Sequence, residues 1–453
     1  MAVKYHLETF GCQMNKYDSE RIESILTQSG MERAADPSQA DVILLNTCSI
    51  RDKAEQKLFS RIGRLALNRK KNKNIIIALG GCMATLRKKE IFKRAPVVDI
   101  IFGPDALKRL PELIEKQRSD KGAKGRLLDV EFGDNGFGDG PEPGARQSKI
   151  SAWVGIAKGC NNHCSYCVVP NTRGREVSRP PDFIIAEVKE LASAGYREII
   201  LLGQNVNSYG KGLQPKTDFS AFLRLVDKVE GIERIRFMTS HPKDLTDRLI
   251  EVMASAKKVC PAIHLPVQAG SDRILRIMNR GYTSSDYIEK VNRLKKTVHG
   301  ITISTDVMVG FPTETEADFQ DTLKVMKEVG FDSIYLFNYS KRPGTRAAER
   351  GEEIPPEISS DRFNRALSLH REIISKKNQN LVGTVVDVLC EGAYNDRREA
   401  GGDGSLNVGW AGRTPGNHMV FFRSERDCAG GIVRLVVTGV AGYNLRGRIE
   451  DKG

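Results

Sequence analysis

Six strand-like apolar runs, each followed by a helical stretch, occupy the middle of the chain. They read ISAWVGIA, REIILLGQN, RIRFMTS, AIHLPVQ, ITISTDVMVG and DSIYLFNYS. Strands that alternate with helices form parallel sheets, because the helix carries the chain back to the edge where the next strand begins. Six such units predict a partial (β/α)6 barrel over residues 149–380, with its functional residues at the carboxyl ends of the strands.

A shorter version of the same alternation precedes this block. The runs KYHLETF, DVILLN, NIIIALG and VVDIIFG are separated by amphipathic stretches, which predicts an open parallel α/β sheet over residues 1–118. The segment GDNGFGDGPEPGA follows, and it is rich in Gly, Asp and Pro with almost nothing to bury. Residues 119–148 are therefore predicted to be a linker.

The last block, residues 381–453, has a third character. It contains TVVDVLCEG, NVGWAG, HMVFF and GIVRLVVTGV, with Gly-rich turns and no helical period. This pattern predicts a small antiparallel β-barrel of a kind that often binds RNA. A chain of 453 residues is long enough for three domains, so the expected fold class is α/β multidomain.

Composition limits where such a chain works. No apolar run approaches the roughly 20 residues that a membrane span needs, and MAVKYHLETFGC lacks the apolar segment of a signal peptide. Nine cysteines without an export signal indicate reduced thiols rather than disulfides. We expect a cytoplasmic protein with no membrane contact, whose thiols can hold metal.

The net charge of +13 is concentrated in one region. Between Arg51 and Arg118 there are 18 Lys and Arg residues against 7 Asp and Glu residues. Solvated helix faces also carry such clusters, but together they indicate a surface that contacts RNA phosphates. The candidate RNA-binding residues of this region are Arg69, Lys70, Lys71, Arg87, Lys88 and Lys89.

The C-terminal block has no such surplus. Between Asn380 and Gly453 it carries 9 basic and 9 acidic residues. RNA binding there would depend on local ion pairs and base stacking rather than on bulk charge. The candidates for these contacts are Trp410, Arg413, Phe421 and Arg423.

Three cysteines at CxxxCxxC spacing follow the first strand of the predicted barrel, in GCNNHCSYCVV. Cys160, Cys164 and Cys167 therefore lie on a loop at the barrel mouth. Zinc and cubane iron–sulfur sites both need four ligands, and His163 is the only fourth candidate in the loop, at a spacing unlike common zinc patterns. A three-cysteine iron–sulfur cluster leaves one iron open, and an open coordination position is what catalysis requires.

Three further cysteines follow strands of the N-terminal sheet: Cys12 in TFGCQMN, Cys48 in NTCSIRDKAEQK and Cys82 in GGCMA. The carboxyl ends of parallel strands gather in one crevice, so cysteines far apart in sequence become neighbours. A free cysteine is usually a buried apolar thiol, but three at equivalent positions predict a second metal cluster. The other cysteines, interpreted as packing residues, are Cys260, Cys390 and Cys428.

The CxxxCxxC loop resembles that of the radical S-adenosylmethionine superfamily, in which an aromatic residue, here Tyr166, precedes the third cysteine. Over nearly the whole chain, the three separated cysteines, the barrel and a C-terminal RNA-binding barrel of the TRAM type resemble the methylthiotransferases. TFGCQMN and NTCSIRDKAEQK are similar to motifs of the bacterial members that act on isopentenyl-adenosine beside the tRNA anticodon.

The resemblance implies two 4Fe-4S clusters and two S-adenosylmethionine molecules per turnover. The cluster on the CxxxCxxC loop would make a radical, with its three cysteines as catalytic residues. The cluster on the three separated cysteines would hold the sulfur that is inserted at carbon-2 of the adenine. Expected partners are a tRNA anticodon stem-loop bearing isopentenyl-adenosine and an electron donor such as flavodoxin or ferredoxin, with the enzyme itself a monomer.

Further strand-end residues are candidates for binding S-adenosylmethionine. The Gly-Gln-Asn sequence that ends the second barrel strand lies where the superfamily usually has a Gly-Gly-Glu turn that binds the methionine amine, and here the carboxylate is replaced. Turns and helix caps use the same residue types. The candidates are Gly203, Gln204, Asn205, Ser240, Gln268 and Asp306.

Alternatives remain open on the sequence alone. The same plan serves enzymes that methylthiolate threonylcarbamoyl-adenosine in tRNA or an aspartate of a ribosomal protein. An iron–sulfur RNA-binding or electron-transfer protein would share the cysteines without any turnover. TFGCQMN and the basic region favour RNA with an isopentenyl group, whose carbons need an apolar pocket. The strand-end aromatic residues that could wall this pocket are Phe311, Phe337 and Tyr339.

Overall fold

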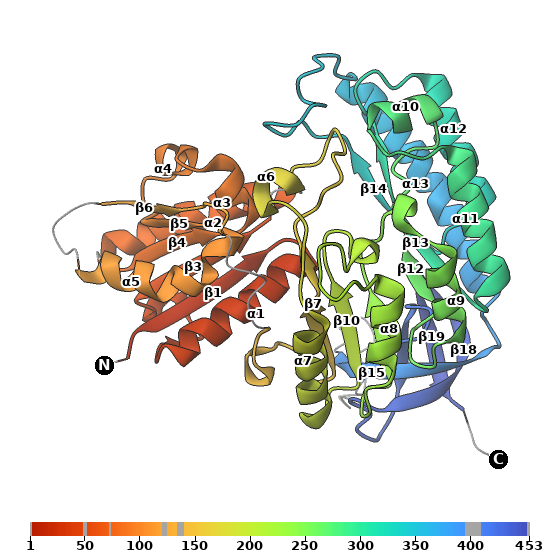
Figure 1. The fold of residues 1–453 in the computed structure, drawn as a ribbon, viewed down its shortest axis with the longest axis horizontal. Helices are drawn as coiled ribbons and strands as arrows, with labels where there is room; N and C mark the ends of the chain where they lie inside the picture. Colours follow the sequence, from red (N-terminus) through yellow and green to blue (C-terminus); the bar gives the residue numbers. More distant parts are fainter. Residues whose placement is uncertain are drawn as a thin grey trace, which may run out of the picture.

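The computed structural model describes residues 2–48, 52–71, 74–119, 125–133, 140–394 and 409–450. These residues form an N-terminal parallel α/β sheet, a central half-barrel of six parallel strands and a closed C-terminal β-barrel (Figure 1). The predicted fold class is confirmed. No helix in the described part of the chain is long and apolar enough to cross a membrane.

All strands of the N-terminal sheet are parallel, in the order β2-β1-β3-β4-β5-β6. Helices cover both faces, so a strand such as VILLNT is buried throughout: Val42 and Leu44 pack on one side, Ile43 and Leu45 on the other. The strands are β1 (Lys4–Phe10), β2 (Glu32–Arg33), β3 (Val42–Thr47), β4 (Ile76–Gly80), β5 (Ile100–Phe102) and β6 (Leu127–Asp129).

The helices of this domain differ from the expected pattern in one place. The amphipathic stretch between the runs NIIIALG and VVDIIFG forms two short helices rather than one, because the chain turns at Lys88, which has a φ of 46°. The strand β6, which pairs with β5, lies inside the stretch expected to be linker, so the sheet extends to Asp129. The helices are α1 (Gln13–Gln28) and α5 (Leu110–Ser119) on one face and α2 (Asp52–Lys71), α3 (Cys82–Arg87) and α4 (Glu90–Arg94) on the other.

The central domain is a half-barrel made of two parallel three-stranded sheets, β7-β10-β11 and β12-β13-β14. Backbone hydrogen bonds from Ile235 N to Lys258 O at 2.8 Å and from Cys260 N to Ile235 O at 2.9 Å join the two sheets into one curved layer. The strands are β7 (Ser151–Gly155), β10 (Glu198–Leu202), β11 (Arg234–Phe237), β12 (Ala262–His264), β13 (Thr302–Val309) and β14 (Ser333–Asn338).

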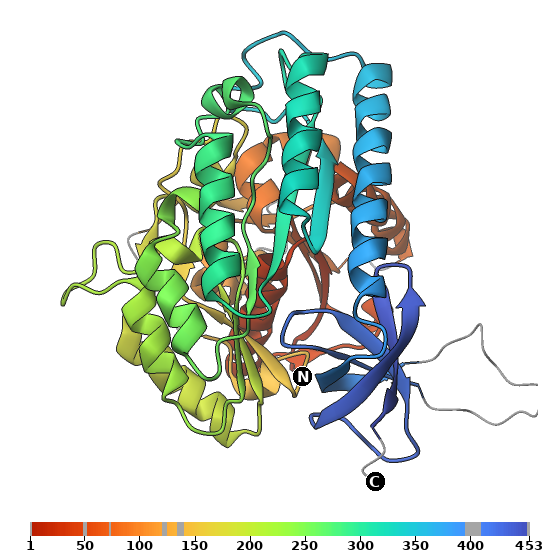
Figure 2. The ribbon, with the colours of Figure 1, turned by 90° about the vertical axis from the view of Figure 1, so that its right-hand side faces the viewer.

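The helices of this domain cover the convex side of this layer, where they stand side by side (Figure 2). The strand β13 therefore alternates: Ile303, Val307 and Val309 are buried under the helices, whereas Ser304 and Asp306 are half-buried and face the concave side. The covering helices are α7 (Pro181–Ser193), α8 (Phe219–Asp227), α9 (Asp247–Ser255), α11 (Ser284–Thr297), α12 (Glu316–Val329) and α13 (Pro356–Gln379).

The C-terminal domain is a closed five-stranded barrel in the order β15-β16-β17-β19-β18. Its pairs are antiparallel, as predicted, apart from the parallel pair β17 and β19. Its core holds Val388, Trp410, Phe422 and Leu435. The strands are β15 (Val385–Tyr394), β16 (Gly409–Arg413), β17 (Met419–Arg423), β18 (Ile432–Ala441) and β19 (Asn444–Ile449).

Two arginines at the amino-terminal ends of the half-barrel strands hold the C-terminal barrel in place. Arg236 of β11 donates hydrogen bonds to the carbonyls of Thr414 at 2.6 Å and Pro415 at 2.9 Å. Arg234 donates to the carbonyl of Arg413 at 2.5 Å. The C-terminal barrel thus sits at one end of the half-barrel, below α13 in Figure 2, and leaves the carboxyl ends of the strands to the N-terminal domain.

Candidate active site

The three cysteines of the CxxxCxxC loop lie between β8 (Ala157–Lys158) and α6 (Val169–Arg173). Cys160 and Cys164 are buried and Cys167 is half-buried. Each sulfur accepts one hydrogen bond. The donors are Asn162 N to Cys160 Sγ at 3.4 Å, Val169 N to Cys167 Sγ at 3.5 Å and Arg280 Nη1 to Cys164 Sγ at 3.4 Å. Such donors stabilise thiolate sulfur, the form that ligates iron.

Distant segments fix this loop in place. Ser165 donates its N–H to the carbonyl of Met278 at 2.9 Å and accepts from Ala347 N at 2.9 Å. Asn279 Nδ2 donates to the carbonyl of His163 at 2.9 Å. The loops after β12 and β14 therefore hold the cysteines, although both lie more than one barrel unit away in sequence.

A zinc site built on the loop finds no support in this geometry. His163 is exposed, and its recorded polar contact is through its backbone carbonyl. Among the described residues, no three Cys, His, Asp or Glu side chains converge as the ligands of a single metal ion would.

Arg280 is the cation nearest the loop. It is buried and donates hydrogen bonds to the carbonyl of Pro266 at 2.8 Å and to the hydroxyl of Tyr282 at 2.9 Å. It also donates to Cys164 Sγ and to the hydroxyl of Tyr166, each at 3.4 Å. None of these partners is a carboxylate. A guanidinium does not lose its proton in proteins, so Arg280 brings a positive charge to the cluster ligands.

The three separated cysteines all lie at the carboxyl edge of the N-terminal sheet. Cys12 ends the turn after β1 and caps α1, Cys48 follows β3, and Cys82 is the first residue of α3. Gly11 has a φ of 141°, and a Cβ on it would lie 2.4 Å from Cys48 Cβ. Only glycine allows the turns that carry Cys12 and Cys48 to approach this closely.

The environments of these thiols differ. A hydrogen bond with Cys48, against the opposing effect of burial, lowers the pKa of Cys12 to about 6. Burial raises the pKa of Cys82, although Arg173 opposes this, and burial raises the pKa of Cys167 to about 12. Thiols with raised pKa values must lose their protons when metal binds, so a cluster that formed on these cysteines would release protons.

Arg173 connects the two groups of cysteines. It ends α6, directly after the CxxxCxxC loop, and is only 6% exposed. Its Nε donates to Cys82 Sγ at 3.1 Å, and its Nη2 donates to Asp18 Oδ2 at 2.6 Å. Burial opposes the charge on Arg173, but Asp18 and Cys82 outweigh it and raise the pKa of the guanidinium. Arg173 thereby joins the segment that follows the CxxxCxxC loop to Cys82 across the domain boundary.

Apolar side chains wall the space beside this contact. Met14 and Tyr17 of α1 pack against Leu202 at the end of β10, with Trp153 and Met238 alongside. Helix α1 therefore lies over the concave side of the half-barrel, next to the cysteine groups.

Some of the strand-end candidates for cofactor binding have the properties of ligand contacts. Asn205 and Ser240 are buried, and within the described residues neither Asn205 Oδ1 nor Ser240 Oγ has a hydrogen-bond partner. Buried polar atoms without partners are costly, so these two atoms fit a polar ligand such as S-adenosylmethionine. Asp306 faces the same concave space, with its Oδ1 3.5 Å from His264 Nε2.

The other candidates take part in the framework. Gln204 Oε1 accepts a hydrogen bond from Gly159 N at 2.5 Å, directly before Cys160, so Gln204 supports the cysteine loop. Gln268 has a φ of 72° and bridges to Val307 of β13. Gly203 packs closely on Val206 and Ala157.

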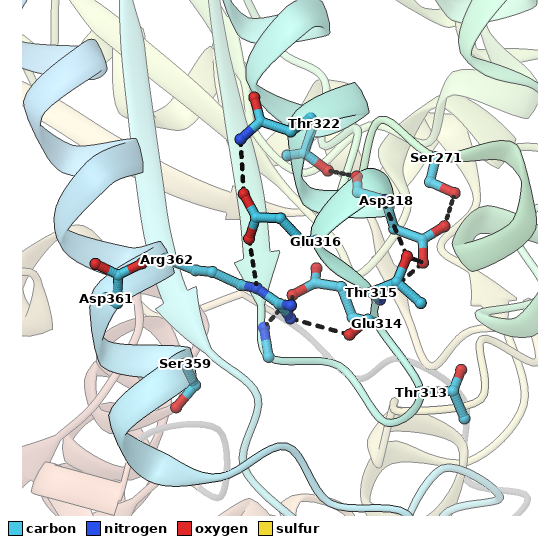
Figure 3. A network of polar contacts seen from close by, with 12 residues as sticks. Ser271, Thr313, Glu314, Thr315, Glu316, Asp318, Thr322, Ser359, Asp361 and Arg362 are labelled. Carbon is cyan, nitrogen blue, oxygen red and sulfur yellow. Dashed lines mark hydrogen bonds and ion pairs between the residues drawn. The ribbon is translucent and has the colours of Figure 1, made fainter.

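The loop after β13 is held by a buried ion pair (Figure 3). Arg362 Nη1 donates to Glu314 Oε2 at 2.9 Å and to the Glu314 carbonyl at 3.0 Å, and Gly310 N donates to the same carboxylate at 2.8 Å. This keeps Phe311 fully buried, with its ring 5.4 Å from that of Tyr339. Phe311 is therefore core packing and does not wall an open apolar pocket.

The basic residues predicted to contact RNA have different surroundings. Arg69 donates to the carbonyl of Val97 at 2.5 Å and to Asp99 at 2.8 Å, so its charge is already paired. Arg87 lies 3.6 Å from Glu55. Lys88 and Lys89 are exposed, whereas the side chains of Lys70 and Lys71 lie outside the described part of the structure.

The candidate RNA-binding residues of the C-terminal barrel also differ in their surroundings. Trp410 is 8% exposed, belongs to the barrel core and donates Nε1 to the carbonyl of Ser424 at 3.2 Å, so its ring does not form a surface for stacking. Arg413 Nε lies 3.0 Å from Glu391. Phe421 lines a cavity, and Arg423 is exposed.

Comparison with known proteins agrees with this arrangement. Residues 4–103 match Uncharacterized protein family UPF0004, and residues 154–326 match the Radical SAM superfamily. Two solved structures share the fold. The radical S-adenosylmethionine methyltransferase TsrM from Kitasatospora setae has a TM-score of 0.54 and 14% sequence identity, covering 77% of this chain and 74% of that chain. The cobalamin-dependent S-adenosylmethionine radical enzyme OxsB has a TM-score of 0.53 and 14% sequence identity, covering 83% of this chain and 56% of that chain.

The half-barrel and its CxxxCxxC loop define a radical S-adenosylmethionine enzyme, a class that implies a 4Fe-4S cluster and S-adenosylmethionine. The tRNA-2-methylthio-N(6)-dimethylallyladenosine synthase of Clostridium novyi is 43% identical over 449 residues, 98% of this chain and 96% of the relative. The synthase of the same name from Aquifex aeolicus is 43% identical over 451 residues, which is 100% of this chain and 99% of the relative. The chain belongs to the tRNA-2-methylthio-N(6)-dimethylallyladenosine synthase family.

Three residues that position the site were not found by sequence reasoning: Asp18, Arg173 and Arg280. The only sequence signal for Arg173 is that it closely follows a cysteine loop, in VVPNTRGR. Arg280 and Asp18 carry no local signal, because their partners lie in other parts of the chain.

We predict that Gly11→Ala disturbs the N-terminal cysteines and leaves the CxxxCxxC loop intact. The added methyl group collides with Cys48 Cβ, so reconstituted protein should lose up to about half of its iron, the share of one of two four-iron clusters. Gly30→Ala is the matched control, because Gly30 also has a positive φ, of 79°, but open space around it. Equal iron contents in the two variants would contradict the close approach of the Cys12 and Cys48 turns.

Proposed function

We propose that the protein inserts a methylthio group at carbon-2 of isopentenyl-adenosine next to the anticodon of tRNA. The observation that carries the proposal is the contact of Arg173 with Cys82 and Asp18, which sets a CxxxCxxC loop beside a second group of three cysteines. The names of the relatives, identical at 43% over nearly their full lengths, supply the substrate.

The target carbon explains why two centres are needed. Carbon-2 of adenine has neither an acidic proton for a general base nor a leaving group for a nucleophile. When bound, a 4Fe-4S cluster and S-adenosylmethionine on the CxxxCxxC loop supply a deoxyadenosyl radical able to abstract hydrogen from such a carbon. We propose that Cys12, Cys48 and Cys82 hold a second 4Fe-4S cluster, which carries the sulfur to be transferred, and that two S-adenosylmethionine molecules are used per turnover.

The chain's own residues would hold the reactants. Asn205 Oδ1 and Ser240 Oγ have no partner within the described residues. Asn205 Oδ1 would accept a hydrogen bond from S-adenosylmethionine, and Ser240 Oγ could accept one or donate one. Tyr166 is fixed by Arg280 beside the cysteine loop. The adenine would be flipped out of its stack to enter the concave space, as enzymes that act on bases generally require.

An apolar wall on this space suits an isopentenyl group. The half-buried side chains of Trp153, Ile200 and Met238 lie there, next to Cys12 and Met14. We propose these residues as the pocket for the isopentenyl carbons, in place of the aromatic residues Phe311, Phe337 and Tyr339 favoured by the sequence pattern. Burying several carbons at about 0.8 kcal/mol each favours the modified base by roughly 2 to 4 kcal/mol.

The remaining partners follow from this proposal. The anticodon stem-loop of the tRNA would bind across the domains, with the exposed Lys88 and Lys89 as phosphate contacts, while Arg69 and Arg87 are engaged by carboxylates. Flavodoxin or ferredoxin would supply the electron. We further propose that the enzyme works as a cytoplasmic monomer.

A threonylcarbamoyl-adenosine or ribosomal-protein substrate is less well supported. The threonylcarbamoyl group carries a carboxylate, and burying an unpaired carboxylate against apolar side chains is costly. An iron–sulfur protein without turnover would have no need for unpartnered polar atoms at Asn205 and Ser240.

We predict that the two cysteine groups are separable. Replacing Cys160, Cys164 and Cys167 with Ala should remove about half of the iron and abolish deoxyadenosine formation from S-adenosylmethionine. Replacing Cys12, Cys48 and Cys82 should also remove about half of the iron but preserve that cleavage. Full iron content in the second variant would exclude a cluster on the N-terminal cysteines. Replacing Cys260, Cys390 and Cys428 is the control and should leave iron unchanged.

Substrate choice is tested with synthetic anticodon stem-loops. We expect methylthio product on RNA bearing isopentenyl-adenosine, with a kcat/KM roughly 30- to 1000-fold higher than on unmodified RNA, because each 1.4 kcal/mol corresponds to a factor of ten. Mass spectrometry of each RNA after single and multiple turnover gives the yields. Comparable yields on unmodified, isopentenyl and threonylcarbamoyl RNA would rule out the apolar pocket, and product on threonylcarbamoyl-adenosine alone would assign the other tRNA substrate.

A further inference from the structure

A cavity of about 360 Å³ lies between the concave face of the half-barrel and the C-terminal barrel. We call it the floor cavity. The half-barrel contributes the end of β11, all of β12 and the amino-terminal parts of β13 and β14. The C-terminal barrel contributes the turn between β16 and β17 and the turn between β18 and β19. Its volume is in the range of small-molecule sites. The side chains used below are Met238, His264, Tyr335, Arg413, His418 and Phe421.

The floor cavity is distinct from the cysteine site but adjacent to it. It includes Met238, which also packs in the cluster that holds Cys12 and Met14. It includes His264, whose Nε2 lies 3.5 Å from Asp306 Oδ1. Met238 therefore borders both the floor cavity and the apolar cluster that contains Cys12.

Two aromatic rings of the cavity are available for stacking. Tyr335 is 45% exposed although it lies within the half-barrel, and His264 contacts it edge-on, with ring centroids 5.7 Å apart and planes at 76°. His264 is itself held by a 3.0 Å contact between its Nδ1 and Ser304 Oγ. Phe421 is half-buried, and the ring of Tyr394 packs against it at 4.7 Å. The rings of Tyr335 and Phe421 are thus each supported on one side by another ring.

Charged side chains that line the floor cavity are paired with opposite charges. The carboxylate Asp332 is paired with Lys377 at 2.5 Å. Burial lowers the pKa of His418, so that ring is neutral at pH 7. Arg413 has a side chain 36% exposed and makes a 3.0 Å ion pair with Glu391. Aromatic platforms with an arginine close by are the usual combination for single-stranded nucleic acid.

We infer that the floor cavity binds an unpaired nucleobase of the substrate RNA that neighbours the modified adenosine, by stacking on Tyr335 and Phe421. The inference rests on the proposed function for the identity of the ligand as RNA. It adds a second base-binding site, formed jointly by the half-barrel and the C-terminal barrel. With one base in the concave space and a neighbour in the floor cavity, the stem-loop is fixed in register relative to the cysteine groups.

The test measures RNA binding and base stacking by the full-length protein with its clusters reconstituted. The probes are anticodon stem-loops bearing isopentenyl-adenosine, in which 2-aminopurine replaces each neighbouring nucleotide in turn. Stacking quenches 2-aminopurine fluorescence, so one position should be quenched on binding. Tyr335→Ala and Phe421→Ala should each relieve that quenching and weaken binding about 5- to 150-fold, the equivalent of 1–3 kcal/mol per stacked base.

Controls separate stacking from damage to the fold. Tyr335→Phe and Phe421→Tyr retain the rings and should restore quenching and affinity. Phe183→Ala, which removes a 59% exposed ring from the outer helix α7, should leave both unchanged. Deoxyadenosine formation without RNA should be the same in all variants, since Tyr335 and Phe421 do not touch the cysteine loop.

The outcomes are decisive in either direction. Unchanged affinity and quenching in both alanine variants would show that the floor cavity holds only water and would overturn the inference, even if methylthio product forms. If quenching depends on Tyr335 or Phe421 but the RNA yields no methylthio product, base binding in the floor cavity would be supported and the proposed function would be rejected.

Discussion

The buried ion pair between Arg173 and Asp18 is the interaction on which the site depends. Its two atoms lie 2.6 Å apart across a domain boundary, and the same guanidinium donates to Cys82 Sγ at 3.1 Å. Removing one partner of such a pair leaves an uncompensated buried charge and costs about 3 to 5 kcal/mol. The N-terminal domain therefore has a strongly preferred position on the half-barrel, with both groups of cysteines at the shared surface.

The two arginines at the cysteines differ in their charge balance. Arg173 is neutralised by Asp18, whereas the hydrogen-bond partners of Arg280 are a sulfur, two tyrosine hydroxyls and a carbonyl. Arg280 thus presents a net positive charge to the CxxxCxxC loop, and Arg173 acts chiefly by holding the N-terminal domain in position. On the opposite end of the half-barrel, Arg234 and Arg236 hold the C-terminal barrel through backbone carbonyls. The concave space between is open to both neighbouring domains.

Much of this architecture could be predicted from local sequence. Alternating apolar runs identified the strands, and parallel strands place the residues at their carboxyl ends together, so the location of Cys12, Cys48 and Cys82 at one edge of the sheet followed from topology alone. Side-chain partners could not be predicted in this way. The sequence pattern predicts a phosphate contact at Arg69, but Asp99 pairs with this arginine. It predicts a stacking surface at Trp410, but this ring fills the C-terminal core. Both outcomes depend on tertiary packing between segments distant in sequence.

The most direct measurement is the separation between the cluster on the CxxxCxxC loop and the proposed second cluster, both reduced, obtained by pulsed electron paramagnetic resonance on reconstituted protein without RNA. In the unchanged protein we expect spin–spin coupling that corresponds to a gap of one base and one sulfur atom. In Arg173→Met we expect a broader and longer distribution of distances. Arg248→Met is the control, because it removes a surface arginine that is paired to Asp218. Clusters too far apart for one base to bridge, or a distribution unaffected by Arg173→Met, would contradict the role assigned to the Arg173 and Asp18 contact.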